Sequence, residues 1–223
     1  ALRRQLTADV AHELRTPLTT VQTHVEAILE GVWEPTRDRL ESCYDEMTRL
    51  SNLVSDLESL SKVESDNLKL NKTEVSLREL TDKILGGFEK ELKDRNLCVE
   101  TEGRCSAVQA DRDRISQVII NLISNAVKYT PVGGEIKITL SDSPDSVVFS
   151  IRDNGIRIPE EELPFVFERF YRADKSRNRN TGGSGIGLAI VKSIITAHGG
   201  TIDVDSRLDE GSDFMFTIPR RMN

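Results

Sequence analysis

The chain has 223 residues, of which 30% are charged and 5% aromatic, and its formal net charge is -7 at pH 7. This length allows one or two domains with buried cores and excludes a small scaffold held together by disulfides. The acidic balance, without a broad basic surface, argues against nucleic acid as a partner.

The cysteines and the apolar runs bear on the compartment. Cys43, Cys98 and Cys105 are odd in number and lack the spacing of a metal site or a secreted disulfide framework. We therefore expect reduced thiols, buried as packing residues, in a cytosolic compartment. No apolar run approaches the roughly 20 residues that span a membrane, and no signal peptide precedes the first helix. Because the chain starts within a helical pattern, we expect it to be part of a longer protein.

Two long helices are predicted first. From Leu2 to about Gly31, apolar residues recur at a spacing close to 3.5, which predicts a helix. A glycine stop, Pro35 and the N-cap candidate Thr36 follow, so a second helix should begin near residue 36. Its apolar stripe alternates spacings of three and four, as in a coiled coil or helical bundle. The stripe consists of Leu40, Tyr44, Met47, Leu50, Val54, Leu57 and Leu60.

Two such helices cannot fully cover each other's apolar faces. We therefore expect an antiparallel hairpin that pairs with a second copy into a dimeric four-helix bundle. The alternative is a hairpin packed on the rest of its own chain. His24 should lie at or near the seam of the bundle, and no function is assigned to it.

The polar segment ESDNLKLNKT breaks the heptad pattern. We expect a helical domain over 1–65, a linker over 66–73 and a second domain over 74–223. Helices are predicted in the second domain over 76–96, 112–130 and 185–200, the last ending near His198, where a partly positive side chain is favourable. Strands are predicted over 97–103, 106–111, 133–142, 145–155, 201–207 and 212–219, and two pairs of them should form hairpins. The mixture favours a multidomain protein of class α and α+β, with a two-layer sandwich as its second domain.

Three clusters in the second domain suggest a nucleotide site. In NLISNAVKY, Asn121 and Asn125 share one helix face, with Lys128 and Tyr129 following. Amide oxygens suit Mg²⁺, and a lysine can meet phosphates. Ordinary buried amides are the alternative explanation for the asparagine pair.

The other two clusters are a turn and a glycine-rich loop. A predicted strand ends in Asp153, Asn154 and Gly155, where a carboxylate can accept a hydrogen bond from an exocyclic amine. In GGSGIGLAIVK, glycines lead directly into a helix, so free N–H groups and the helix dipole can hold phosphate. These glycines are Gly182, Gly183, Gly185 and Gly187.

The segments HELRTP, NLISNAVKY, DNGIRIP, FERFYR, GSGIGLAIVK and EGSDFMFTIP, in this order, resemble the catalytic core of a two-component sensor histidine kinase. The resemblance covers essentially the whole chain. Residues 1 to about 65 resemble the dimerisation and histidine-phosphotransfer hairpin, and residues from about 74 to 223 resemble the ATP-binding domain of the Bergerat type.

The resemblance implies autophosphorylation from ATP and Mg²⁺, transfer to an aspartate of a cognate response regulator, and phosphatase activity toward that regulator. It also implies a homodimer. The chain would be the cytoplasmic portion of a full-length protein that upstream segments anchor in the cell membrane. His12 would be the phosphoacceptor, and Asn125 would coordinate Mg²⁺. Asn121 stands where hydrolysing relatives carry a glutamate base. The resemblance also implies that the polar segment RADKSRNRNTGGSG is an ATP lid anchored by Phe167 and Phe170. The other implied ATP-binding residues are Lys128, Tyr129, Asp153, Gly155, Arg172, Gly183, Gly185 and Gly187.

One position departs from the family pattern D-x-G-x-G, because Arg157 replaces the second glycine. The arginine either strains the turn and narrows the pocket or points outward and tunes ATP affinity. Both alternatives stay open in the sequence.

The histidine box suggests roles for its neighbours. Glu13 would accept a hydrogen bond from Nδ1–H of His12, which leaves Nε2 free as the nucleophile. Thr16, one turn beyond His12, would position a water for the phosphatase reaction. Pro17 removes the donor for the carbonyl of Glu13, so a kink that serves as a hinge is expected just beyond His12. The alternatives from other classes are a scaffold that binds ATP poorly and an ATPase that hydrolyses with water.

Overall fold

The computed structural model describes residues 2–63, 69–171, 184–207 and 211–220, and within the first helix the side chains of Val10 and of Leu14 onward. The chain divides into two compact units, a helical hairpin and a domain of mixed strands and helices. Within the described residues, the longest helices are too polar to cross a membrane.

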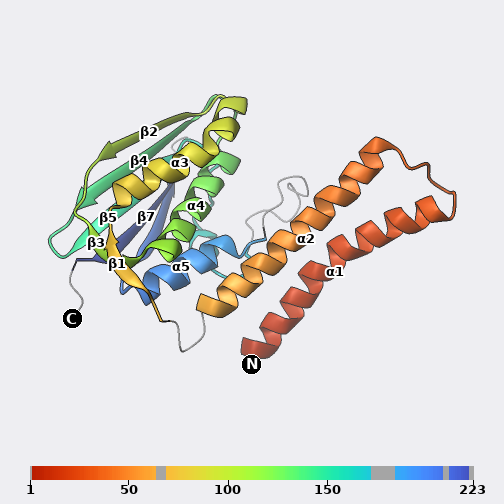
Figure 1. The fold of residues 1–223 in the computed structure, drawn as a ribbon, viewed down its shortest axis with the longest axis horizontal. Coiled ribbons are helices and arrows are strands. Elements are labelled where there is room, and N and C mark those ends of the chain that lie inside the picture. The colour runs from red at the N-terminus through yellow and green to blue at the C-terminus, as the bar shows by residue number, and fades with distance from the viewer. Residues whose placement is uncertain (1, 64–68, 172–183, 208–210, 221–223) are drawn as a thin grey trace. The chain divides into compact units, whose positions relative to one another are not determined.

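Two antiparallel helices, α1 (Leu2–Leu29) and α2 (Arg37–Val63), form the first unit (Figure 1). The glycine stop is confirmed, since Gly31 has a φ of +72°, and the N–H groups of Val32 and Trp33 both donate to the carbonyl of Ala27 at 2.9 Å. The helices therefore begin and end close to the predicted positions, and α1 continues through Pro17 without interruption.

Near the loop of the hairpin, side chains of α1 and α2 contact each other. His24 is half-buried, with Nδ1 3.8 Å from Sγ of the buried Cys43 and its ring edge-on to Trp33. Much of the apolar stripe remains exposed, as expected for a surface that a second copy would cover. The exposed apolar residues of α1 and α2 are Leu18, Val25, Leu29, Leu40, Tyr44, Met47 and Val54.

A sheet of five strands forms the centre of the second unit, in the spatial order β2 (Cys98–Gly103), β4 (Glu135–Asp142), β5 (Ser146–Asp153), β7 (Gly211–Pro219) and β6 (Ile202–Arg207). The pairs β4-β5 and β6-β7 are the antiparallel hairpins predicted from the turns. The parallel pairing of β2 with β4 joins strands that are separated by a helix and another strand.

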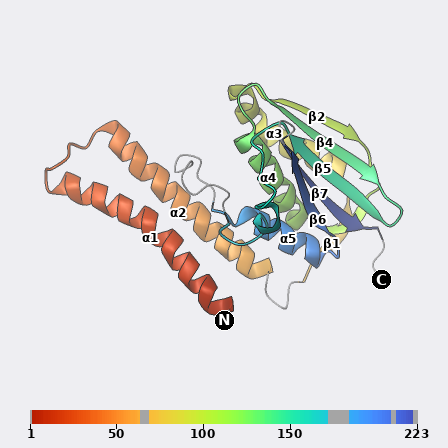
Figure 2. The same ribbon diagram turned by 180° about the vertical axis from the view of Figure 1, so that it is seen from behind.

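Three helices cover one face of this sheet (Figures 1 and 2): α3 (Leu77–Asp94), α4 (Arg112–Tyr129) and α5 (Gly187–Ala197). Side chains of Ser76 and Asp111 cap the N-termini of α3 and α4 by accepting from backbone N–H groups. The predicted two-layer sandwich is confirmed. Its core holds the stacked rings of Phe149 and Phe216, with centroids 4.8 Å apart.

A short antiparallel strand pair and a 3₁₀ helix complete the second unit. The pair consists of β1 (Lys72–Val75) and β3 (Val108–Asp111), and the 3₁₀ helix is η1 (Leu163–Phe165). β1 was not predicted, and its first two residues lie within the expected linker. The strand is four residues long and pairs only with β3, so its sequence carries little periodicity.

The expectation of a partly positive His198 is wrong. The side chain is buried at 3% exposure, Nδ1 lies 2.8 Å from the carbonyl of Ile194, and Nε2 accepts from the backbone N–H of Asp111 at 3.0 Å. Burial lowers the pKa of His198, and the nearby Lys72 lowers it further. His198 is therefore a neutral structural residue that joins the end of α5 to the start of α4.

All three cysteines are free, but only Cys43 is buried. Cys98 is exposed and Cys105 is half-buried, so the expectation of three buried packing residues is wrong for these two. Cys98 begins β2, which lies at the edge of the sheet, where one side of the strand has no neighbouring strand to cover it.

Candidate functional site

Asp153 lies at the end of β5 on the face that otherwise forms the core. Every second residue of the strand is buried, and Asp153 takes the place that follows Val147, Phe149 and Ile151. Its carboxylate Oδ1 accepts from the N–H of Gly155 at 2.8 Å. The alternation of the strand thus directs a carboxylate toward the helical layer, at 5% exposure.

The surroundings of Asp153 alter its proton affinity. Burial raises its pKa to about 6, against the opposing effect of backbone N–H groups of Gly155 and Ser212, and Asp213 adds a smaller increase. The carboxylate is therefore ionised at neutral pH and becomes a neutral acid in mildly acidic solution. An ionised carboxylate accepts hydrogen bonds only, which matches the amine of an adenine ring.

The turn after Asp153 packs against the end of α4. A Cβ atom on Gly155 would lie 2.5 Å from both Oδ1 of Asp153 and the carbonyl oxygen of Tyr129, so only glycine fits. The N–H of Ile156 donates to the same carbonyl at 3.3 Å. Two clusters that are separate in the sequence, around Tyr129 and Asp153, therefore form one site.

The third cluster joins through Asn121. Its Nδ2 donates to the carbonyl of Gly187 at 3.2 Å, which links the middle of α4 to the first residue of α5. This half-buried amide thus has a structural hydrogen bond, as the alternative explanation for it expects, and its Nδ2 lies beside the start of α5. A Cβ on Gly187 would meet the Asn121 amide at 3.7 Å, an ordinary contact, so local packing does not require glycine there.

Asn125 and Lys128 lie along the same helix. Asn125 is half-buried one turn beyond Asn121, and Nζ of Lys128 lies 4.8 Å from the centroid of the Tyr129 ring. Among the described residues, no group of three His, Cys, Asp or Glu side chains could hold a metal. The amide oxygen of Asn125 is a hard ligand, and Mg²⁺ typically completes its shell with water and substrate phosphates, so this residue fits a magnesium ion.

The start of α5 is shaped by Gly185. It has a φ of +71°, and a Cβ there would lie 2.9 Å from backbone atoms of Phe170, which itself has a φ of +60°. The N-terminus of α5 carries no side-chain cap at Ile186. An uncapped helix N-terminus beside Asn121 provides N–H groups and a positive dipole end for an anion.

The structure tests one part of the two alternatives for Arg157, namely strain of the turn. The side chain is exposed, and the described non-glycine residues with positive φ are Asn96 and Phe170. The backbone at Arg157 therefore does not adopt the left-handed conformation that would strain an arginine, and the exposed side chain agrees with the outward orientation.

Gly211 and Ser206 support the turn and were missed in the sequence. Gly211 has a φ of +79°, and a Cβ there would collide with the carbonyl of Asp153. Oγ of Ser206 accepts from the N–H of Ile158 at 2.9 Å and donates to the carbonyl of Gly211 at 2.8 Å. A glycine at the start of a predicted strand was the available signal, but its partner lies almost 60 residues earlier.

The histidine box lies within α1. His12, Glu13, Thr16 and Pro17 are all helical, and the four-residue separation of His12 and Thr16 places them on one face. Thr16 is exposed, its carbonyl accepts from Oγ1 of Thr20 at 3.1 Å, and Pro17 is buried. The side chains of His12 and Glu13, and the whole of Arg172, Gly182 and Gly183, lie outside the described residues.

Comparisons with known families match both units. Residues 2–66 match the His Kinase A (phospho-acceptor) domain, and residues 110–222 match the histidine kinase-, DNA gyrase B-, and HSP90-like ATPase family. The sensor histidine kinase WalK of Bacillus subtilis is 40% identical over 97% of the chain. The chain spans 36% of the length of that relative.

Solved structures agree. The histidine kinase AdeS of Acinetobacter baumannii is 34% identical with a TM-score of 0.79, over 95% of this chain and 98% of that one. The histidine kinase ThkA, solved in complex with the response regulator protein TrrA, is 32% identical with a TM-score of 0.79, over 97% of this chain and 61% of that one. With both family domains in order and a histidine kinase structure matched almost end to end, the chain belongs to the sensor histidine kinases and carries their catalytic core.

Proposed function

We propose that this chain transfers the γ-phosphoryl group of ATP to Nε2 of His12 and then passes it to an aspartate of a response regulator. The observation that carries the proposal is the convergence of the Asp153 turn, the end of α4 and the start of α5 in a chain that also carries a histidine box. Phosphoryl transfer requires mainly positioning and charge neutralisation, which such a site offers.

Each part of the nucleotide would meet a different element. The carboxylate of Asp153 accepts the adenine amine beside Gly155, and Tyr129 lies against the nucleotide. Asn125 coordinates Mg²⁺, and Lys128 contacts a phosphate as a point charge. Gly183, Gly185 and Gly187 shape the loop at the start of α5, and Arg172 supplies a further cation. Asn121 cannot act as the base that activates water, which favours a kinase over a hydrolysing ATPase.

The helical box would provide the acceptor chemistry. Glu13 accepts from Nδ1–H of His12, so Nε2 attacks the γ-phosphorus while the bond to the bridging oxygen of ADP breaks. Thr16 orients a water that attacks the phosphorus of the aspartyl phosphate on the regulator, which releases inorganic phosphate and the free aspartate. Pro17 is a hinge of α1. The hydrogen bond from Oγ1 of Thr20 to the carbonyl of Thr16 supports this role, because such bonds from a threonine to the preceding turn tend to bend helices. An unchanged kinase-to-phosphatase ratio in Pro17→Ala would contradict this role.

The partners follow from the same surfaces. The apolar residues exposed on α1 and α2 support a homodimer through a four-helix bundle. ThkA was solved with a response regulator, which supports a cognate regulator for this chain. Since the chain spans only part of its relatives, we also propose that it is the cytoplasmic portion of a longer, membrane-anchored sensor.

Incubation of the purified chain with γ-labelled ATP tests the proposal against its rivals. A kinase incorporates label only with Mg²⁺, and the label is released by acid, as expected of phosphohistidine. A scaffold would bind ATP poorly and take up no label. A hydrolysing ATPase would release inorganic phosphate in multiple turnovers without labelled protein.

A further inference from the structure

Arg95, at the C-terminal end of α3, donates hydrogen bonds to carbonyls at the C-terminal end of α4. Its Nη1 donates to the carbonyls of Val127 and Lys128, the latter at 3.2 Å, and its Nη2 donates to the carbonyl of Thr130 at 2.8 Å. The residue is half-buried, and its own carbonyl accepts from the N–H of Gly133 at 3.0 Å. One side chain thus binds three carbonyls that the helix itself cannot satisfy.

The remaining carbonyls at this helix end also have partners. The carbonyl of Ala126 accepts from both the N–H and Oγ1 of Thr130, at 3.0 and 2.6 Å. That of Tyr129 accepts from Ile156 in the turn after Asp153. Arg95 therefore binds the end of α4 at the carbonyls of Val127, Lys128 and Thr130. The carbonyl of Tyr129, which lies among them, binds the turn after Asp153.

We propose that Arg95 is a positioning residue for the nucleotide site, acting through the end of α4 on Lys128, Tyr129 and the Asp153 turn. The inference rests on the proposed function, because it assumes that ATP binds where these groups meet. Arg95 does not reach the nucleotide in this role. It fixes the direction in which two of the site's side chains and the turn beside them are presented.

The chemistry of the guanidinium suits this task. Its planar fork presents several donors in fixed directions, whereas a lysine ammonium is a single compact charge on a flexible stem. A cation at a helix C-terminus also interacts favourably with the negative end of the dipole. A lysine at position 95 would keep the charge interaction but could not donate hydrogen bonds to the three carbonyls at the same time.

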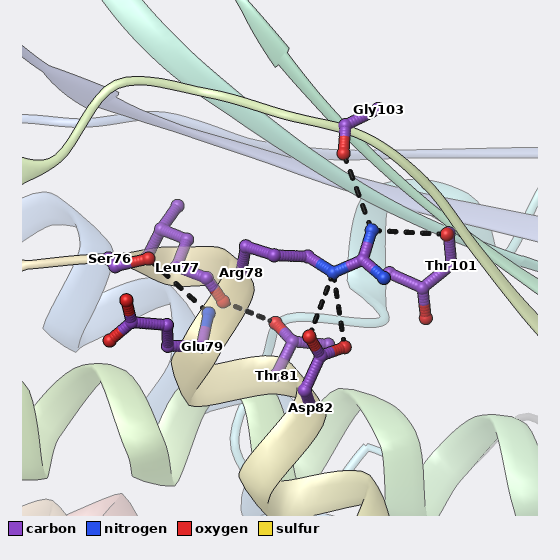
Figure 3. A network of polar contacts seen from close by, with 8 residues as sticks. All are labelled: Ser76, Leu77, Arg78, Glu79, Thr81, Asp82, Thr101 and Gly103. Atoms are coloured by element: carbon purple, nitrogen blue, oxygen red, sulfur yellow. Dashed lines mark hydrogen bonds and ion pairs between the residues drawn. The ribbon is translucent and has the colours of Figure 1, made fainter.

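The same helix offers a matched control (Figure 3). Near its first turn, Nη1 of Arg78 donates to the carbonyls of Thr101 and Gly103 at 3.2 and 3.4 Å, while Nε bonds to Asp82. Arg78 is half-buried like Arg95. It joins α3 to the edge strand β2 and makes none of these bonds to α4 or to the Asp153 turn. A purely structural role for both arginines predicts equal effects on nucleotide binding.

The test compares Arg95→Gln, Arg95→Lys and Arg78→Gln in the complete chain, with calorimetric titration of Mg-ATP, steady-state autophosphorylation and thermal unfolding. We expect Arg95→Gln to raise the Kd and KM for ATP about tenfold, because misaligned groups lose binding geometry, with kcat changed far less. Arg95→Lys should fold like the unaltered chain, and its Kd and KM for ATP should lie between those of the unaltered chain and those of Arg95→Gln. Arg78→Gln should lower the unfolding temperature without changing Kd.

Two results would overturn the inference. One is an unchanged Kd in both Arg95 variants, and the other is an equal rise in Kd in Arg78→Gln. The proposed function is separable, because a chain that binds Mg-ATP without labelling His12 would refute the kinase reaction and leave the Arg95 comparison of Kd intact. Absence of Mg-ATP binding by the unaltered chain would overturn both.

Discussion

The two units of the chain differ in how completely they bury their apolar residues. In the sandwich, the inward positions of β4, β5 and β7 are almost fully buried, with Ile138, Phe149 and Phe216 at 0% exposure. In the hairpin, Tyr44 is 67% exposed and Leu40 and Met47 are about half exposed. The sandwich closes its own core, whereas the hairpin presents a stripe that needs a partner.

The difference teaches how the proposed reaction is divided. Under the proposed function, the nucleotide binds within the sandwich of one chain, and the proposed acceptor His12 lies on a helix whose hairpin presents an apolar stripe that a second copy would cover. Changes in one unit should therefore affect one property and spare the other. The following substitutions test that separation, starting with the largest expected effect.

Replacing Asn125 by Ala should reduce Mg-ATP-dependent labelling of the chain by at least about a hundredfold, because the metal that neutralises and orients the phosphates loses its protein ligand. Labelling assays measure the loss, and light scattering should show an unchanged dimer. Ser124→Ala, at an exposed neighbouring position of α4, is the control. Full labelling in Asn125→Ala would refute its role as a magnesium ligand.

Asp153→Asn should weaken ATP binding about tenfold or more, because an amide cannot replace the charged acceptor. It should also stabilise the sandwich at neutral pH. Burial raises the pKa of Asp153 to about 6, so its favourable contribution to folding is complete below its unfolded pKa of 3.8 and is lost as pH rises through 6. The loss is about 3 kcal/mol at pH 7.5, because the pKa differs by about two units between the unfolded and folded states.

Thermal unfolding at several pH values checks the second effect. The unfolding temperature of Asp153→Asn should exceed that of the unaltered chain at pH 7.5, and the gap should shrink toward pH 5. A gap that does not change with pH would contradict the assignment of the effect to this carboxylate.

Tyr44→Glu should convert the dimer to a monomer, because it places a charge in the middle of the exposed stripe, where a bundle would bury it. Sedimentation velocity measures the change. The Kd for ATP should stay within about twofold, because the substitution leaves every residue of the sandwich unchanged. Asn52→Glu adds the same charge to α2 outside the stripe and should leave the dimer intact. A dimer that tolerates Tyr44→Glu equally well would place the interface elsewhere.

Thr16→Ala is the smallest of these perturbations. Removal of the hydroxyl should reduce dephosphorylation of the partner regulator about tenfold or more, since a positioned water is lost, with autophosphorylation spared. Phosphate release from the phosphorylated regulator is the measurement, with Thr19→Ala, at an exposed position three residues later, as the control. Loss of both activities in Thr16→Ala would indicate a structural role for the residue.

Most of the secondary structure could be predicted because its signals are local. Glycine at position 31 and the period of the apolar residues placed α1 and α2, and alternation in 133–155 placed a hairpin. β1 was missed because a four-residue strand is defined by its distant partner β3. His198 was misjudged for a similar reason, since its neutral state follows from burial in the folded domain, where Nε2 accepts from the backbone N–H of the distant Asp111.

The residues of the candidate site were predictable as types, but their arrangement was not. The sequence identifies a buried-strand aspartate, an asparagine pair and a glycine loop, yet the contact of Gly155 with the carbonyl of Tyr129 depends on the packing of α4 on the sheet. Arg95 carries no motif at all. Its importance emerges only when the partners of the last carbonyls of α4 are counted.

We propose above that His12 on the hairpin receives a phosphoryl group from ATP bound to the sandwich. Mass spectrometry of the chain after incubation with Mg-ATP, under conditions that preserve acid-labile phosphate, tests it most directly. We expect one phosphohistidine in the peptide containing His12 and none in His12→Gln. The Kd for ATP should be the same in the unaltered chain and in His12→Gln. Phosphate on another residue, or undiminished labelling of His12→Gln, would contradict it.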